Sequence, residues 1–253
     1  MKVLYCNPIF LDYRLPFYKR LNELFDGNFY VMYSTTRYKM RHNEHLLKQI
    51  PEVLGRNALP FENEKLFNTY EMSFKRYNGE KGKRIPITKG LYRSIKNIKP
   101  DLLHCITIKP CLIGGVLAKK FNLPVIVSFV GLGRVFSSDS MPLKLLRKFT
   151  IAAYKYIANN KRCIFMFEHD RDRKKLAKLV GLEEQQTIVI DGAGINPEIY
   201  KYSLEQDHDV PVVLFASRML WSKGLGDLIE AKKILRSKNI HFTLNVAGIL
   251  VEN

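Results

Sequence analysis

With 253 residues, of which 46% are hydrophobic, the chain is long and apolar enough for one large domain or two small ones. Its 41 Lys and Arg residues outnumber its 24 Asp and Glu residues, and the net charge of +17 indicates an anionic partner. No nucleic-acid-binding motif accompanies these cations, and no segment approaches the roughly 20 apolar residues of a membrane span. The sequence therefore argues against a transmembrane protein and against a nucleic-acid partner.

Strand and helix patterns alternate along the first 190 residues, which predicts an α/β fold with a parallel sheet covered on both faces. The predicted strands are Val3–Cys6, Phe29–Tyr33, Asp101–Ile106, Pro124–Val130, Cys163–Phe167 and Thr187–Ile190. The predicted helices are Leu15–Phe25, Pro86–Ile98, Pro110–Phe121, Pro142–Arg162 and Asp170–Val180. Residues 35–82 are polar and aromatic with few periodic runs, and for them we expect a long excursion containing a short hairpin.

A second unit follows a polar stretch, so we place an interdomain linker at residues 197–209, between an N-terminal domain at 1–196 and a C-terminal region at 210–253. The second unit has two predicted strands, Val212–Ala216 and Phe242–Ala247, joined by the helix Leu225–Ser237. One βαβ unit cannot bury its own faces, so we expect this region to be an incomplete domain and the chain to be truncated.

The cysteines and the first residues of the sequence indicate the cellular compartment of the protein. The four cysteines lie in or beside apolar runs, without metal-ligand spacing or a paired framework, and are expected to be reduced core thiols. Met1-Lys-Val-Leu-Tyr5 enters directly into a strand pattern with no charged leader. We expect a cytoplasmic protein with no metal site and no cofactor.

The turn Arg218-Met-Leu-Trp-Ser-Lys223-Gly224 lies between a strand and a helix of the second unit. In open α/β domains, ligands bind at the carboxyl ends of the strands, where helix N-termini present free N–H groups to anions. Arg218 and Lys223 would suit a diphosphate. Because the turn has neither a Walker lysine-serine pair nor a GxGxxG pattern, spacing alone leaves an exposed basic turn as an equal alternative.

The stretch from Ala216 to Ala231 resembles the donor-diphosphate segment of the family 4 glycosyltransferases, retaining nucleotide-sugar enzymes with the two-domain, Rossmann-like GT-B fold. Further matches to that family occur in order along the chain, at Phe10–Phe17, Lys109–Gly115, Gly131–Phe136 and Gly192–Asn196. Together they resemble the subgroup that builds bacterial surface polysaccharides, such as O-antigen or capsule. The resemblance covers nearly the whole chain.

The resemblance implies a nucleoside-diphosphate sugar as donor, with Arg218, Lys223 and Gly224 holding its diphosphate. The family also places two glutamates eight residues apart in the second domain, and no residue of this chain corresponds to them. The donor site is therefore expected to be half built, and the sequence assigns no catalytic residue. Many family members have a histidine at about the position of Val130, so the residue that contacts the donor sugar is open.

The loops after the N-terminal strands would form the acceptor side, and Arg14 and Lys109 are candidate ligands for a lipid-linked pyrophosphate. Gly131 and Gly133 would let backbone N–H groups approach a phosphate or sugar, or they simply form a tight βα turn. His104 lies within an apolar strand, where a core histidine is favoured over a catalytic one. The cluster Glu168-His169-Asp170 is a weak candidate for a metal or acid/base site, because Asp170 also suits a helix cap.

The predicted helix after Pro142 carries cations interleaved with Leu, Phe and Tyr and contains no acid. Such a helix can lie on an anionic membrane, each cation contributing about 1 kcal/mol, or it can be a crossover helix with a solvated basic edge. We assign membrane binding to Lys144, Arg147, Lys148 and Lys155. The protein would then be peripheral on the inner face of the plasma membrane.

The sequence thus favours a retaining glycosyltransferase that moves a sugar from a nucleotide-sugar to a lipid-linked saccharide. The alternative is a non-catalytic remnant that binds the membrane or the acceptor lipid without turnover.

Overall fold

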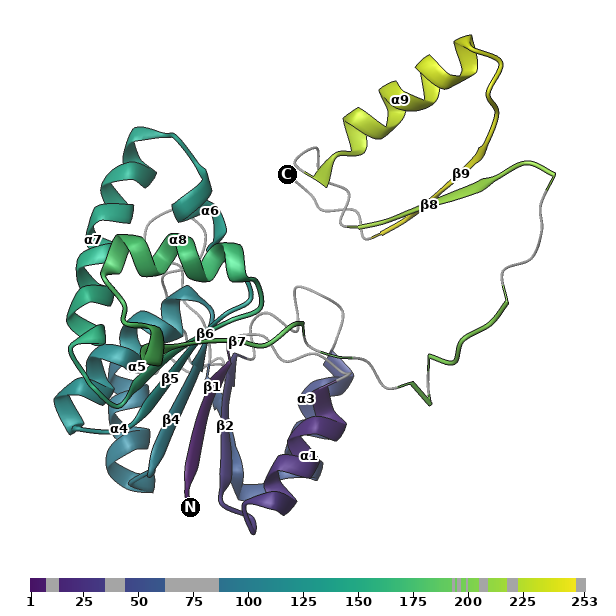
Figure 1. Ribbon diagram of the computed structural model, residues 1–253. Helices are drawn as coiled ribbons and strands as arrows, with labels where there is room; N and C mark the ends of the chain where they lie inside the picture. The colour runs from purple at the N-terminus through teal and green to yellow at the C-terminus, as the bar shows by residue number, and fades with distance from the viewer. Residues whose placement is uncertain are drawn as a thin grey trace, which may run out of the picture. The chain divides into compact units, whose positions relative to one another are not determined.

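The computed structural model describes residues 1–7, 14–34, 44–61, 87–192, 194, 197–198, 200–204, 209–217 and 223–248 (Figure 1). The chain divides into two compact units, Met1–Gly194 and Ile195–Asn253. The linker expected at 197–209 falls at the start of the second unit, where the described residues form neither helix nor strand.

The first unit is built on a seven-stranded sheet in the order β3-β2-β1-β4-β5-β6-β7, and every strand pair in it is parallel. The strands are β1 (Val3–Asn7), β2 (Phe29–Ser34), β3 (Ala58–Phe61), β4 (Leu102–Ile106), β5 (Val125–Phe129), β6 (Cys163–Phe167) and β7 (Thr187–Val189). The strand order reverses between β1 and β4, which pair directly, Cys6 lying opposite Cys105. Such a switch point is where open α/β sheets bind ligands.

Helices cover both faces of this sheet, as the alternating pattern predicts (Figure 1). On one face, residues of α1 (Leu15–Leu24) and α3 (Glu44–Leu54) form a core with Tyr5 and Phe29. The opposite face packs against α4 (Ile87–Ile98), α5 (Ile108–Phe121), α7 (Met141–Ala158) and α8 (Asp170–Val180). The first unit also contains the short helix α6 (Gly133–Ser137) and the 3-10 turn η3 (Glu184–Gln186).

Small residues let α5 lie very close to the sheet and to α7. A Cβ atom on Gly114 would stand 2.2 Å from the Cys105 sulfur, and one on Gly115 would stand 2.7 Å from the Cδ1 atom of Ile157. Glycine at these two positions therefore allows α5 to pack closely against β4 and α7.

The expected excursion with a hairpin at residues 35–82 is wrong in its described part. Residues 44–61 instead form α3, the 3-10 turn η2 (Gly55–Asn57) and the parallel edge strand β3. In α3 the buried residues Leu46, Ile50 and Leu54 recur every four positions, which is the helical period, although Pro51 lies inside the helix. Residues 35–43 and 62–82 lie outside the described residues.

The second unit contains the βαβ arrangement expected from the sequence. The strands β8 (Val212–Ala216) and β9 (Thr243–Ala247) pair in parallel, and α9 (Leu225–Ser237) connects them. Both strands are largely exposed, Leu214 at 64%.

Candidate functional site at the carboxyl edge of the first sheet

Four of the predicted site residues follow three neighbouring strands at the carboxyl edge of the first sheet. Arg14 precedes α1, which follows β1, and Lys109 is the second residue of α5, which follows β4. Gly131 and Gly133 follow β5. Since β1, β4 and β5 are adjacent and parallel, the topology brings these residues to one edge of the sheet.

Arg14 belongs to a polar cluster at the end of β1. Its guanidinium forms hydrogen bonds with the hydroxyl groups of Tyr5 and Tyr18, and the Asn7 amide donates to the Tyr18 hydroxyl at 3.1 Å. Burial raises the pKa of both tyrosines, while the hydrogen bonds to Tyr18 and the nearby Arg14 charge act in the opposite direction on Tyr18. Arg14 is only half-buried, so this cluster orients a cation close to the sheet edge.

His104 occupies the middle of β4 and is a core histidine, as its apolar context suggested. Its Nε2 atom lies 2.8 Å from the Ser128 hydroxyl on β5, and its ring packs edge-on against Tyr5 with centroids 4.9 Å apart. Burial lowers the pKa of His104 to about 4, so the ring is neutral at physiological pH.

The loop after β5 is short: residues 130–132 connect the strand directly to the short helix α6, which agrees with the tight βα turn considered from the sequence. Gly133 begins α6 with φ of +64°, and a Cβ atom there would approach the Ile108 side chain at 3.3 Å. A larger residue would be strained by its backbone and crowded by α5. Glycine at this position therefore allows the start of α6 to lie close to the start of α5.

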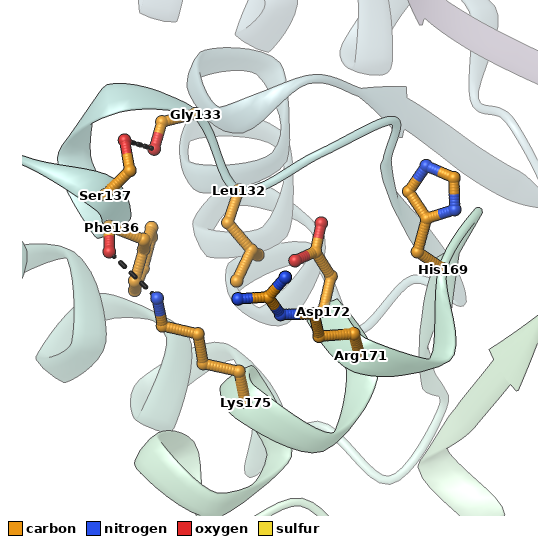
Figure 2. A pocket seen from close by; sticks show the side chains of 8 residues that line it. All are labelled: Leu132, Gly133, Phe136, Ser137, His169, Arg171, Asp172 and Lys175. Carbon is orange, nitrogen blue, oxygen red and sulfur yellow. Dashed lines mark hydrogen bonds between the residues drawn. The ribbon is translucent and has the colours of Figure 1, made fainter.

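A hollow of about 610 Å³ opens between the β5 loop with α6 and the first turns of α8 (Figure 2). Its lining residues are Leu132, Gly133, Phe136, Ser137, His169, Arg171, Asp172 and Lys175. The sequence placed only Gly133 in a site and named His169 as part of a weak cluster. The cations Arg171 and Lys175 were missed, although their spacing of one helical turn could have revealed a shared face.

The charged residues of α8 fall into two groups: some form ion pairs at the surface, and others line the hollow. Arg173 and Lys174 each contact the Asp170 carboxylate at 2.7 Å, and these hydrogen bonds, with Lys174 the larger cause, lower the pKa of Asp170. Asp170 is thus a surface ion-pair residue, and it is not the helix cap that the sequence suggested, since His169 is the N-cap and no side chain caps the helix. The residues that face the hollow are Arg171, Asp172 and Lys175.

Cations from two helices hold α6 in place. Lys175 of α8 donates to the Phe136 carbonyl at 3.0 Å, as the dashed line in Figure 2 shows. From α7, Arg147 donates to the carbonyls of Val135, at 2.7 Å, and Ser138. The Arg147 guanidinium therefore binds backbone carbonyls within the fold. The other three cations assigned to membrane binding are exposed lysines.

The outward face of α7 combines an apolar stripe with a row of lysines. Exposed apolar residues recur along α7 at helical spacing, with Leu145 at 58% and Phe149 at 66%. The stripe consists of Met141, Leu145, Phe149 and Tyr156, and Leu146 is exposed beside it. Lys144, Lys148 and Lys155 are also exposed, and their spacing places them beside this stripe. Lys144 makes one ion pair, with the exposed Asp139 at 3.6 Å. None of the helices in the described part of the chain is long and apolar enough to cross a bilayer.

The donor-side prediction falls on the second unit, of which Lys223 and Gly224 are described and Arg218 lies outside the described residues. Gly224 is the N-cap of α9 with φ of +84°, a conformation that favours glycine. Lys223 is exposed directly before this helix N-terminus, where an anion would be stabilised.

All four cysteines are free and buried, which confirms the expected core thiols. Burial raises the pKa of Cys105 and Cys111, so these thiols are protonated and unreactive. Within the described ranges, no group of three or more His, Cys, Asp or Glu side chains has the arrangement of a metal site.

Comparison with known proteins relates this geometry to sugar transfer. Residues 58–168 match the family described as glycosyl transferase 4-like. A Campylobacter jejuni protein, N,N'-diacetylbacillosaminyl-diphospho-undecaprenol alpha-1,3-N-acetylgalactosaminyltransferase, is 26% identical over 162 residues, a match that covers 58% of this chain and 42% of the relative. The match thus spans less than half of that protein's length.

Solved structures share the fold at low sequence identity. Anabaena HepE in complex with UDP-glucose has a TM-score of 0.57 at 12% identity, over 99% of this chain and 70% of that one. The sucrose-phosphate synthase of Thermosynechococcus elongatus has a TM-score of 0.56 at 14% identity, over 100% of this chain and 71% of that one. These likenesses show an α/β fold of the GT-B class.

Proposed function

We propose that this chain is a family 4 glycosyltransferase and that it transfers a sugar from a nucleoside-diphosphate donor to a lipid-linked saccharide in the synthesis of a bacterial surface polysaccharide. The name of the C. jejuni relative supports a lipid-linked acceptor, and the UDP-glucose bound to HepE supports a nucleotide-sugar donor. The proposed transfer retains the configuration of the anomeric carbon.

The observation that carries this proposal is the meeting of two features in the first unit. A hollow lined by Arg171 and Lys175 opens at the ligand-binding edge of the sheet, and its α6 wall is bonded through Arg147 to α7. The outer face of α7 carries the apolar stripe and the lysines. A lipid-linked saccharide needs both a polar site for its head and an enzyme that stays at the membrane surface.

On the donor side, Arg218, Lys223 and Gly224 are proposed to hold the diphosphate. The leaving diphosphate gains negative charge as the bond to the sugar breaks, and cations together with the α9 N-terminus stabilise that charge. The exposure of Lys223 and the left-handed N-cap at Gly224 support this assignment. Arg14, Lys109, Gly131 and Gly133 remain the proposed acceptor-side residues.

Membrane association is proposed to be peripheral, on the cytoplasmic face, through the outer surface of α7. The apolar stripe would enter the headgroup region while Lys144, Lys148 and Lys155 contact anionic lipid. Their charges complement an anionic bilayer, and the net charge of +17 agrees in sign. This arrangement would place the carboxyl edge of the sheet near membrane-embedded acceptors.

The test joins the chain to a second domain that carries the family's paired glutamates, and incubates this protein with a panel of UDP-sugars and with a polyprenyl diphosphate carrying one N-acetylhexosamine. We expect release of UDP together with a lipid product heavier by one sugar, and NMR of that product reports whether the anomeric configuration is retained. Acceptor binding with no release of UDP from any donor would favour the alternative, a protein that binds the lipid without turnover.

A further inference from the structure

The hollow between α6 and α8 is lined by cations, a carboxylate and apolar side chains, which is more than a site for a simple anion requires. Of the five cations of α8, Arg173 and Lys174 each form an ion pair with the Asp170 carboxylate at 2.7 Å. Arg171 and Lys175 line the hollow instead, one helical turn apart. Two cations at this spacing suit the two phosphate groups of a diphosphate.

The carboxylate of Asp172 faces the same hollow, and in the sequence Asp172 lies between Arg171 and Lys175. A carboxylate repels a bare phosphate, so its presence disfavours a site for a simple anion. It is, however, a strong acceptor for hydroxyl groups. The lining therefore fits a ligand that presents a diphosphate and hydroxyl groups side by side.

Apolar side chains form another part of the lining. Leu132 and Phe136 contribute from the β5 loop and α6, and both are almost fully buried, with exposures of 5% and 2%. With so little surface exposed, these two side chains shape the floor of the hollow, and the charged side chains are left to contact a ligand. The helix that carries Phe136 is bonded to α7, which has the apolar outer stripe.

We propose that the hollow binds the diphosphate and adjoining sugar of a lipid-linked saccharide, with Arg171 and Lys175 contacting the diphosphate and Asp172 accepting a hydrogen bond from a sugar hydroxyl. This inference rests on the proposed function, whose acceptor it locates. It assigns ligand contacts to three side chains of α8, in addition to the glycines of the β5 loop. Lys175 also holds the Phe136 carbonyl, so it joins ligand binding to the position of α6.

The first experiment measures equilibrium binding, without donor, of a polyprenyl diphosphate bearing one N-acetylhexosamine in detergent micelles. Arg171→Gln should weaken binding about ten-fold or more, because it removes charge-assisted hydrogen bonds to phosphate. Lys174→Gln is the matched control, since it makes the same charge change on the same helix at a residue paired with Asp170, and it should change binding less than about two-fold. Equal losses in both variants, or none with Arg171→Gln, overturn the proposal.

The second experiment compares the glycosylated lipid with the same polyprenyl diphosphate lacking sugar. Asp172→Asn should weaken binding of the glycosylated lipid and leave or strengthen binding of the sugar-free lipid, because the carboxylate contacts only the sugar. A loss of equal size for both lipids, accompanied by altered circular dichroism, would assign Asp172 to folding and overturn its role. Competition by phosphatidylglycerol micelles as effective as by the sugar-free lipid diphosphate would identify a general headgroup site and overturn the proposal.

The two hypotheses fail in different ways. Binding with the expected variant pattern but no sugar transfer refutes the proposed function and leaves the hollow as a lipid-diphosphate site. Sugar transfer with an unchanged acceptor KM in Arg171→Gln refutes the hollow and leaves the function in place.

Discussion

The Arg147 guanidinium of α7 donates a hydrogen bond to the carbonyl oxygen of Val135 in α6 at 2.7 Å. A second hydrogen bond from the same side chain reaches the Ser138 carbonyl, just beyond the end of α6. Arg147 therefore joins the helix that faces outward to the helix that walls the hollow. The sequence pattern alone predicts the same membrane-binding role for Arg147 as for its lysine neighbours.

Replacing Arg147 by Gln should lower the free energy of unfolding by about 1–3 kcal/mol, because two partly buried carbonyl groups lose a charged hydrogen-bond donor. Lys148→Gln makes the same charge change at an exposed position and should alter stability by less than about 0.5 kcal/mol. Urea denaturation of both variants tests this. Equal stabilities would mean that the α6 carbonyls are satisfied equally well by water.

Replacing Lys144, Lys148 and Lys155 together by Glu should release the protein from anionic vesicles, because each lysine near the surface contributes about 1 kcal/mol. Binding of the unaltered protein should also weaken as salt rises, since the surface potential decays within about 8 Å at physiological ionic strength. Vesicle co-sedimentation measures both effects.

The control for this triple variant reverses three exposed lysines elsewhere in the first unit, Lys19, Lys48 and Lys99. It makes the same change in net charge and should retain most of the binding. Release of both triple variants to the same extent would show that overall charge, and not the outer face of α7, holds the protein on the vesicle.

In the chain joined to a complete second domain, Lys223→Ala and Arg218→Ala should each lower the rate of sugar transfer by about two to three powers of ten, the loss expected when a charge-stabilising group is removed from a transition state. The exposed Lys238, at the C-terminal end of α9, provides the comparison, and Lys238→Ala should leave the rate nearly unchanged. Turnover measured at saturating donor separates this effect from weaker donor binding. Full activity in Lys223→Ala would show that Lys223 belongs to an exposed basic turn and does not bind the diphosphate.

Gly114→Ala should destabilise the first unit by about 1–3 kcal/mol, because the new methyl group would stand 2.2 Å from the buried Cys105 sulfur. Gly90→Ala in α4 is the contrast, since its Cβ would lie 3.5 Å from the Met32 Cε atom, an ordinary contact, and alanine favours a helix by up to about 1 kcal/mol. Thermal unfolding should therefore move in opposite directions for the two variants. A stabilised Gly114→Ala would show that the strand and α5 can separate at little cost.

Stability should fall as pH decreases from about 6.5 to about 4 because of His104. Burial lowers the pKa of this histidine to about 4 in the folded protein, against 6.5 for an exposed histidine, so between these values the unfolded chain binds a proton that the folded chain excludes. The stability contribution is complete above the unfolded value and decreases by up to about 3 kcal/mol toward the folded value. His104→Gln should flatten this part of the curve in denaturation experiments, and an unchanged slope would assign it to other groups.

Local patterns made most of the fold predictable from the sequence. The run Cys163–Phe167 and the helix Asp170–Val180, closed by Gly181 in a left-handed conformation, have the bounds that apolar runs and a terminal glycine indicate. The strand β3 was missed because it has only four residues and contains Pro60, which is tolerated at the edge of a sheet.

The site was less predictable, because it depends on contacts between segments distant in the chain. Lys175 meets the Phe136 carbonyl across 39 residues, and nothing in either local pattern specifies that meeting. Composition likewise suggested a basic surface helix, but it did not show that the Arg147 guanidinium turns toward backbone carbonyls while its lysine neighbours remain exposed.

The pairing of β1 with β4 has a consequence for how the protein is made. Val3 lies opposite Leu102, so β1 receives its neighbour at the switch point only after nearly a hundred further residues have left the ribosome. Until then β1 can pair with β2 alone, and its other edge is open to wrong partners. Contacts this distant along the chain slow folding. Nascent chains halted before β4 should therefore depend on chaperones far more than chains released after β7.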